Sequence, residues 1–334
     1  LALIDAIPAL LAGCPVLMKP SELCPTFVPV LRESVAAVPD LARVLQIVEG
    51  GPEVGRAVVE LVDAVCFTGS VSTGRAVAAA AAAAFIPAFL ELGGKDPAVV
   101  AASADLDVAT SGVLWGATAN TGQSCMSIER VYVERPIADR FVTQLVAKAR
   151  QVTLAVSGAS DGDLGPFIDP RQADVVRRHL EDAVGRGARI RCGGEIEVHG
   201  GRSFLRPTVL TGVDHSMLVM TEETFGPVIP VMAVDDLDEA VRLANDSRYG
   251  LSAAVFAEPE QARELAARIH AGGISINDVC LTGLVPEGEK QAFRSSGLGP
   301  SRMGPASLRR FLRQRVLLER QHPGIQPWWY ATQS

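Results

Sequence analysis

Cys125 is the side chain in this sequence best placed to act as a nucleophile. It ends the segment Asn120–Cys125 (NTGQSC), a polar, glycine-containing loop that follows an apolar, helix-like stretch. A thiol in such a loop can reach a substrate and nearby backbone N–H donors. Four other cysteines (Cys14, Cys66, Cys192 and Cys280) lie in or beside strand-like apolar runs, where cysteine behaves as a small hydrophobic residue. By itself, the loop position of Cys125 favours an inert thiol over a nucleophile.

Glu91 is a candidate general base thirty-four positions before Cys125. It lies at the end of the apolar run 88–92 and is followed by Gly93, Gly94 and Lys95. Glycines beside a carboxylate let it approach a substrate, and a carboxylate in such a place can activate water. The alternative is a surface carboxylate that pairs with Lys95.

Two other segments could hold a nucleotide. Gly69 and Ser70 connect a strand-like run to an alanine-rich helix, and the free N–H groups of a helix start bind anions such as pyrophosphate. The alternative is an ordinary turn with Ser70 as the helix N-cap. Lys19 and Glu22, in KPSE, follow an earlier strand-like run. A carboxylate there could accept ribose hydroxyls and repel a 2′-phosphate, but a solvated Lys–Glu pair is also compatible.

The elements that position these residues alternate between strand and helix. In the first ninety residues we expect strands at 14–19, 43–51, 62–67 and 88–92, with helices at 25–38, at 52–61 and in the alanine-rich stretch after Ser70. Such alternation predicts a parallel sheet with right-handed crossovers, whose ligands bind at the carboxyl ends of the strands.

Gly93 and Gly94 interrupt this pattern, and a second α/β unit follows them. We expect its strands at 97–101, 130–134, 228–234, 252–257 and 273–277, and its helices at 105–119, 137–151, 172–185, 237–245 and 259–271. The predicted domains are therefore 1–92, 93–294 and a Gly-, Pro- and Arg-rich tail at 295–334.

Composition excludes several classes of protein. The 334 residues are 48% hydrophobic and 21% charged, with a net charge of −7, which disfavours nucleic acids and anionic membranes as partners. The longest apolar run, Ala76–Leu90, contains Pro87 and is shorter than the roughly 18 residues that a membrane span requires. Six scattered cysteines and five histidines show no metal-binding spacing, so we expect a cytoplasmic protein without a metal.

Five segments together resemble the aldehyde dehydrogenase superfamily, in the order found there: KPSE (19–22), FTGS (67–70), ELGGKDP (91–97), NTGQSC (120–125) and EETFGPV (222–228). The resemblance implies a Rossmann-like parallel-sheet cofactor domain, a second α/β catalytic domain and a C-terminal oligomerisation arm. It also implies that Cys125 attacks an aldehyde to give a thiohemiacetal and then a thioester, which water activated by Glu91 hydrolyses to a carboxylate.

The same resemblance assigns binding roles. Lys19 and Glu22 would hold the adenosine ribose, and Gly69 and Ser70 the pyrophosphate. Glu223 would bind the nicotinamide ribose, with Phe225 near the ring, and residues 279–283 would line the mouth of the aldehyde pocket. Three residues would border that pocket: Trp115, Ser124 and Met126. Glu22 favours NAD over NADP, and the family arm implies a homo-oligomer, a dimer or a tetramer.

The sequence also departs from the family pattern. It opens at Leu1 within an apolar stretch, and the family's oxyanion asparagine lies upstream of the matching segment, so we expect a truncated chain with low activity. The stretch from 287–290 to 302–304 stands where the family more often has a Phe-Gly-Gly-type segment, so the resemblance does not predict the substrate-entry loop. Three alternative functions remain at this point: a non-catalytic binding or structural partner, a cofactor-independent cysteine esterase, and transfer of the acyl group to coenzyme A.

Overall fold

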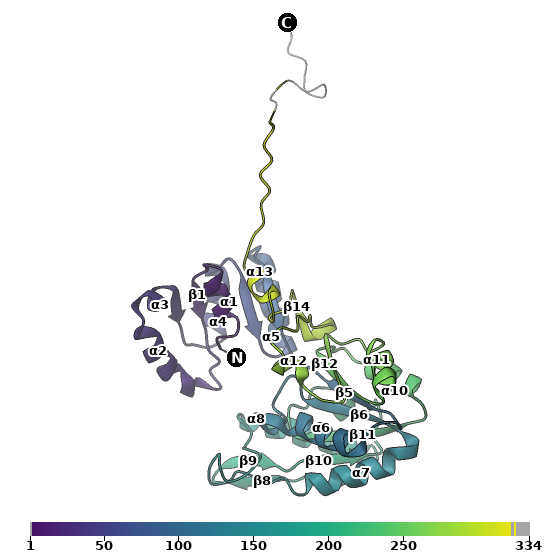
Figure 1. Ribbon diagram of the computed structural model, residues 1–334. Coiled ribbons are helices and arrows are strands. Elements are labelled where there is room, and N and C mark those ends of the chain that lie inside the picture. The colour runs from purple at the N-terminus through teal and green to yellow at the C-terminus, as the bar shows by residue number, and fades with distance from the viewer. Residues whose placement is uncertain (1, 322–323, 325–334) are drawn as a thin grey trace.

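Two groups of parallel strands organise the chain in the computed structural model, which describes residues 2–321 and residue 324 (Figure 1). The N-terminal group carries short strands and their helices, and the second group forms one large sheet. The two groups lie beside each other, and the C-terminal segment returns to the first group before it extends away from both (Figure 1).

The N-terminal group alternates strand and helix as predicted. β1 (Val16–Met18) pairs with β2 (Leu45–Ile47), and β3 (Val65–Thr68) pairs with β4 (Ala88–Glu91), both in parallel. The connecting helices are α2 (Val28–Ala36), α4 (Pro52–Leu61) and α5 (Val71–Ala83), and further helical segments are α1 (Ala6–Leu11), η1 (Pro25–Phe27) and α3 (Pro39–Val44).

Two details of the predicted first unit were wrong. The four strands form two separate hydrogen-bonded sheets among the described residues, where one continuous parallel sheet was expected. The strand expected from residue 43 starts only at Leu45, because Pro39 begins α3 where a helix stop was expected. Proline fits the first turn of a helix, where its missing N–H has no partner to lose.

The second group is a seven-stranded sheet with the order β13-β12-β5-β6-β11-β10-β7, and only β7 runs antiparallel to its neighbour. Five of its strands were predicted: β5 (Asp96–Val100), β6 (Ile128–Glu134), β11 (Val228–Val234), β12 (Ser252–Phe256) and β13 (Gly273–Ile276). The sequence reading missed β7 (Arg189–Cys192) and β10 (Thr208–Thr211), and also the hairpin of β8 (Ile196–His199) and β9 (Arg202–Leu205).

Helices cover both faces of this sheet. α6 (Leu106–Thr118) and α7 (Arg135–Ala149) pack on one face in a single apolar cluster. The opposite face carries α8 (Pro170–Gly185), α9 (Leu218–Thr221), α10 (Leu237–Asn245) and α11 (Pro259–Ala266). A parallel sheet requires cover on both faces, which explains why β5 and β12 are buried at every residue.

The C-terminal segment returns to the N-terminal group. After α12 (Leu281–Leu284) and η3 (Arg294–Ser296), β14 (Gly297–Leu298) pairs antiparallel with β4. Around α13 (Ala306–Arg309), Arg302 and Arg310 both bind the carboxylate of Asp5, at the start of α1. The tail then runs out as an extended chain (Figure 1), and the last residues of the predicted arm lie outside the described residues.

Within the described part of the chain, no helix is both long and apolar enough to cross a membrane. The same residues contain no group of three or more His, Cys, Asp or Glu side chains placed to hold a metal ion.

Candidate active site

Several of the predicted site residues lie at strand ends of the two groups. Gly69 and Ser70 follow β3, and Glu91 is the last residue of β4, so both stand at carboxyl ends of the N-terminal strands. Cys125 precedes β6 and Glu223 precedes β11, so both stand at amino ends of strands in the large sheet. The site therefore draws on opposite ends of the strands in the two groups.

Short contacts join these residues through the backbone at Gly93 and Gly94. The N–H of Gly69 donates to the carbonyl of Glu91 (3.2 Å), and the N–H of Gly94 donates to Oε1 of Glu223 (3.0 Å). A Cβ atom on Gly94 would lie 2.2 Å from the carbonyl oxygen of Cys125, and one on Gly93 would lie 2.4 Å from Oε2 of Glu223. Only glycine lets Glu223 and the Cys125 loop approach this backbone so closely.

The loop before Cys125 has an unusual backbone that other residues hold in place. Asn120, Thr121 and Gly122 all have positive φ, and Nδ2 of Asn120 donates to the carbonyl of Gln123 (2.8 Å). A Cβ on Gly122 would lie 2.4 Å from the carbonyl carbon of Gly226, so the loop packs directly on the segment that follows Glu223. This packing leaves Cys125 half-buried.

Burial governs the acid–base properties of the site. It raises the pKa of the Cys125 thiol to about 11, and the nearby charges of Asp96, Glu223 and Glu91 act in the same direction. Lys290 opposes them, because a cation stabilises the thiolate. Burial also raises the pKa of Glu223 and that of Asp96 to about 7 each.

Alkylation of Cys125 is therefore expected to depend steeply on pH. Iodoacetamide reacts with the thiolate, so its rate should rise about tenfold per pH unit up to a pH near 11, where the raised pKa of Cys125 lies. In the Lys290→Met variant the rate at pH 9 should fall, because the stabilising cation is gone. Peptide mass spectrometry gives the rate for each cysteine, and exposed Cys24 is the internal control. A rate at Cys125 that is unchanged by Lys290→Met would contradict the expectation.

The residues predicted to hold the adenosine ribose pair with each other. Nζ of Lys19 lies 3.0 Å from Oε2 of Glu22, and the Glu22 carboxylate remains 53% exposed. A hydrogen bond from its own backbone N–H, together with Lys19, lowers the pKa of Glu22. Ser70 caps α5 by accepting a hydrogen bond from the N–H of Thr73 (3.2 Å), which is the arrangement that the alternative of an ordinary turn describes.

The residues predicted to border the aldehyde pocket differ in their surroundings. Ser124 accepts a hydrogen bond from the N–H of Met126 (3.3 Å), and the Met126 sulfur accepts one from the Thr282 hydroxyl (3.6 Å). Trp115 is 50% exposed near the end of α6. Val279 does not line a pocket mouth as expected, because it is buried in the core against α6.

Several polar residues at the site were not predicted from the sequence. Lys95 does not pair with Glu91, as one reading allowed, but with Glu129, at 2.7 Å and nearly without exposure. Asp96 is fully buried and accepts hydrogen bonds from the N–H and hydroxyl of Ser252. A signal was present for one of them: Glu129 is a charged residue beside Arg130 in a strand whose other positions up to Val133 are Ile, Val, Tyr and Val, and buried charged residues need partners.

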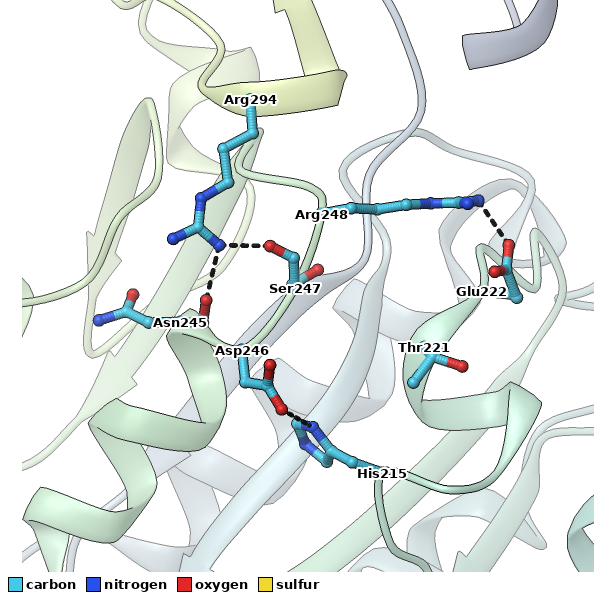
Figure 2. A pocket seen from close by; sticks show the side chains of 8 residues that line it. All are labelled: His215, Thr221, Glu222, Asn245, Asp246, Ser247, Arg248 and Arg294. Atoms are coloured by element: carbon cyan, nitrogen blue, oxygen red, sulfur yellow. Dashed lines mark hydrogen bonds and ion pairs between the residues drawn. The ribbon is translucent and has the colours of Figure 1, made fainter.

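A large cavity opens beside this site but contains none of its predicted residues. Its volume is about 540 Å³, and its walls include Glu222, the neighbour of Glu223 (Figure 2). The wall residues satisfy one another: Arg248 binds Glu222, His215 binds Asp246, and Arg294 donates to the carbonyls of Asn245 and Ser247. None of the residues predicted from the sequence to act in catalysis or binding lines this cavity.

Comparison with known proteins gives one consistent result. The model of the "Aldehyde dehydrogenase family" matches residues 1–317. A relative from Mycolicibacterium smegmatis, named "Putative succinate-semialdehyde dehydrogenase [NADP(+)]", is 39% identical over 83% of this chain and 54% of its own length. This chain spans about half the length of the curated relatives that it matches.

Solved structures agree with this result. "Putative Aldehyde Dehydrogenase PutA" from Anabaena variabilis has a TM-score of 0.97 and 55% identity, over 99% of this chain and 71% of its own. The betaine aldehyde dehydrogenase of Staphylococcus aureus in complex with NAD+ has a TM-score of 0.90 and 30% identity, over 98% and 66%. The family model covers nearly the whole chain, and solved members of the family have the same α/β fold, so this chain belongs to the aldehyde dehydrogenase family.

Proposed function

We propose that the protein oxidises an aldehyde to a carboxylate with NAD(P)+, using Cys125 as nucleophile and Glu91 as general base. One observation carries the proposal: the Gly93–Gly94 backbone follows Glu91 directly and touches both the Cys125 loop and Glu223. A nucleophile, a base and a ribose-binding carboxylate thus surround one short segment. The overall reaction consumes aldehyde, water and oxidised dinucleotide, and it releases carboxylate, reduced dinucleotide and two protons.

The chain's own residues supply the covalent steps. The Cys125 thiolate adds to the carbonyl carbon, and the oxyanion of the thiohemiacetal needs hydrogen-bond donors. Within residues 2–321, the N–H of Cys125 has no hydrogen-bond partner, so it is free to donate to that oxyanion. When bound, NAD(P)+ would accept a hydride from the thiohemiacetal carbon. The acyl group would then remain on Cys125 as a thioester. Glu91 then takes a proton from water, and the resulting attack releases the carboxylate.

The residues present fit a dinucleotide. Gly69 and Ser70 are exposed at the start of the thirteen-residue helix α5, whose first N–H groups suit a pyrophosphate. One carboxylate oxygen of Glu223 is held by Gly94, which leaves the other for a ribose hydroxyl. The exposed carboxylate of Glu22 suits the hydroxyls of the other ribose. We place Phe225, next in the same segment, beside the nicotinamide ring.

Glu22 supports NAD over NADP, although one relative carries NADP(+) in its name. A 2′-phosphate on the adenosine ribose would lie close to the Glu22 carboxylate and be repelled by it. Lys19 would not offset this repulsion, because it is already paired with Glu22. In Glu22→Gln the ratio of kcat/KM for NADP to that for NAD should rise about tenfold or more, because a like-charge repulsion is removed. A ratio that stays constant would show that another residue selects the cofactor.

The direct test is an assay of the purified chain. We expect aldehyde-dependent formation of reduced dinucleotide at 340 nm, measured over a panel of aliphatic, aromatic and carboxylate-bearing aldehydes. A longer version should be tested beside it, since this chain spans about half the length of the curated relatives that it matches. If neither version oxidises any aldehyde with NAD or NADP, the proposed function is wrong.

Partners and location follow from the same features. We place the protein in the cytoplasm, a proposal supported by six unpaired cysteines, which suit a reducing compartment. We also place it in a homo-oligomer, because Val316, Leu317 and Leu318 are strongly exposed on the extended tail and suit a strand added to a second copy. Sedimentation of the chain and of a form ending at residue 311 measures this: loss of the oligomer on truncation is expected.

A further inference from the structure

We propose that the buried ion pair of Lys95 and Glu129 is a positioning device that holds Glu223 and Phe225 in place for the cofactor. This inference rests on the proposed function, because it takes Glu223 as the ligand of the nicotinamide ribose. It assigns a role to Lys95 and Glu129, two buried residues that contact the segment carrying Glu223. From the sequence alone, Lys95 was considered only as a surface partner of Glu91.

Glu129 binds the backbone of the segment that carries Glu223. It is the second residue of β6, and it reaches the loop before the neighbouring strand β11. Its Oε2 accepts a hydrogen bond from the N–H of Thr224 (2.7 Å), and its Oε1 accepts one from the N–H of Phe225 (2.8 Å). One carboxylate thus fixes two consecutive peptide units that immediately follow Glu223.

Lys95 completes the same clamp from the other side. Its Nζ donates to Oε2 of Glu129 (2.7 Å) and to the hydroxyl of Thr224 (3.0 Å). Its backbone is continuous with Gly94, whose N–H holds the Glu223 carboxylate (3.0 Å). Lys95 therefore connects the glycine pair, which approaches Glu223 and Cys125, to the loop on which Glu223 stands.

The loop needs such a clamp because its backbone is strained. Phe225 has a φ of 51°, a left-handed conformation that non-glycine residues adopt at a cost. Hydrogen bonds to the charged carboxylate of Glu129 offset that cost at this position, since charge-assisted bonds are the stronger ones. Without them, the segment can relax and carry Glu223 away from Gly94.

Burying the two charges of this pair has a desolvation cost, so we expect the pair to have a role beyond stability. The Lys95 side chain has no exposed surface and that of Glu129 has 2%. Burying two charges gains little stability over an apolar pair of similar volume. That role is to bind the N–H groups of Thr224 and Phe225, because an apolar pair could not accept hydrogen bonds from them.

Amide hydrogen exchange tests the clamp without any cofactor. In Glu129→Gln, exchange in the peptide that covers 222–227 should accelerate about tenfold or more, while exchange in the central strand β5 stays as in the wild type. Thr224→Val is a milder variant that keeps the ion pair and removes the contacts of the Thr224 hydroxyl with Lys95 and with Nδ1 of His179, and it should show a smaller change in the same peptide. Glu129→Asp should recover part of the protection.

Binding tests the consequence for the cofactor. The Kd for NAD, measured by calorimetry on the full chain, should rise about 10- to 100-fold in Glu129→Gln, as expected for lost charge-assisted hydrogen bonds. Where aldehyde oxidation is measured, KM for NAD should rise more than kcat falls. The matched control is Asp235→Asn, which breaks the exposed pair of Arg135 and Asp235 beyond the far end of β11 and should change neither value.

The two arms separate the two proposals. If the wild type binds no NAD or NADP, the proposed function fails while exchange still decides the role of the pair. If Glu129→Gln does not fold, Thr224→Val decides by the same exchange measurement. Exchange at 222–227 that is unchanged, or that rises equally across the sheet, overturns the positioning role, as does an unchanged Kd in a folded Glu129→Gln.

Discussion

Cys125→Ser is expected to lose aldehyde oxidation by a factor of about 10⁴ or more, because a serine hydroxyl ionises far less readily than a thiol and is a much weaker nucleophile. The change replaces one atom in a loop whose backbone Asn120, Gly122 and Gly226 hold in place, so the fold should be unaffected. Initial rates at 340 nm over the aldehyde panel give the activity. The melting temperature confirms that the variant is folded.

Cys24→Ser is the matched control for this experiment. Cys24 is also a free thiol, but it is exposed and lies in the segment after β1, apart from the Cys125 loop. Its replacement should leave both rate and NAD binding unchanged. If Cys125→Ser kept more than a tenth of the wild-type rate, the nucleophile would have to be sought elsewhere.

The fold was predicted well where the local pattern alone determines structure. The short apolar runs before Lys19 and Glu91 became β1 and β4, and Ser70 became the N-cap of α5, because side-chain periodicity and capping depend on near neighbours. The predicted alternation of strand and helix needed no information from distant residues. The residues between α8 and α9 show the limit: β7 to β10 are only four residues long each, and β7 to β9 are partly exposed, so their pattern is weak.

At the site, the motif residues were predicted and their supports were not. Cys125 and Glu91 stood out by type and neighbours, Glu223 was named only through the family resemblance, and the structure joins their segments around Gly93 and Gly94. Lys95 and Glu129 meet only because β6 lies between β5 and β11, an order that no local pattern contains. Lys290 acts on Cys125 from a segment 165 positions further along the chain, and its charge has meaning only in the folded protein.

Tertiary placement also explains the wrong expectation for Val279. An apolar residue near a predicted pocket mouth suits either the pocket wall or the core. In the structure α6 carries Gly112 and Gly116, and the space above these glycines is filled by Val279 and its neighbours. The sequence does not show that two glycines one turn apart in a helix will receive a side chain from a segment more than 160 positions away.

Glu91→Gln is expected to separate the two halves of the reaction. A glutamine keeps the size of the side chain but cannot take a proton from water, so the thioester on Cys125 should form and then persist. We expect a burst of reduced dinucleotide close to one equivalent per active site, followed by a steady-state rate lower by about 10²- to 10⁴-fold. Rapid-mixing absorbance at 340 nm measures the burst, and mass spectrometry detects the acyl group on the peptide that contains Cys125.

The position of Glu91 makes this variant a clean one. Its backbone pairs with Thr68 in β3 and with Gly297 in β14, and its carbonyl accepts the N–H of Gly69, so the register does not depend on the carboxylate. Glu60→Gln, an exposed carboxylate on α4, is the control and should keep the wild-type rate. Loss of the burst together with the steady state would place Glu91 before the thioester, in activation of Cys125. An intact steady-state rate would remove it from the reaction, and the water-activating base would then have to be one of the other carboxylates near the sulfur, Glu223 or Asp96.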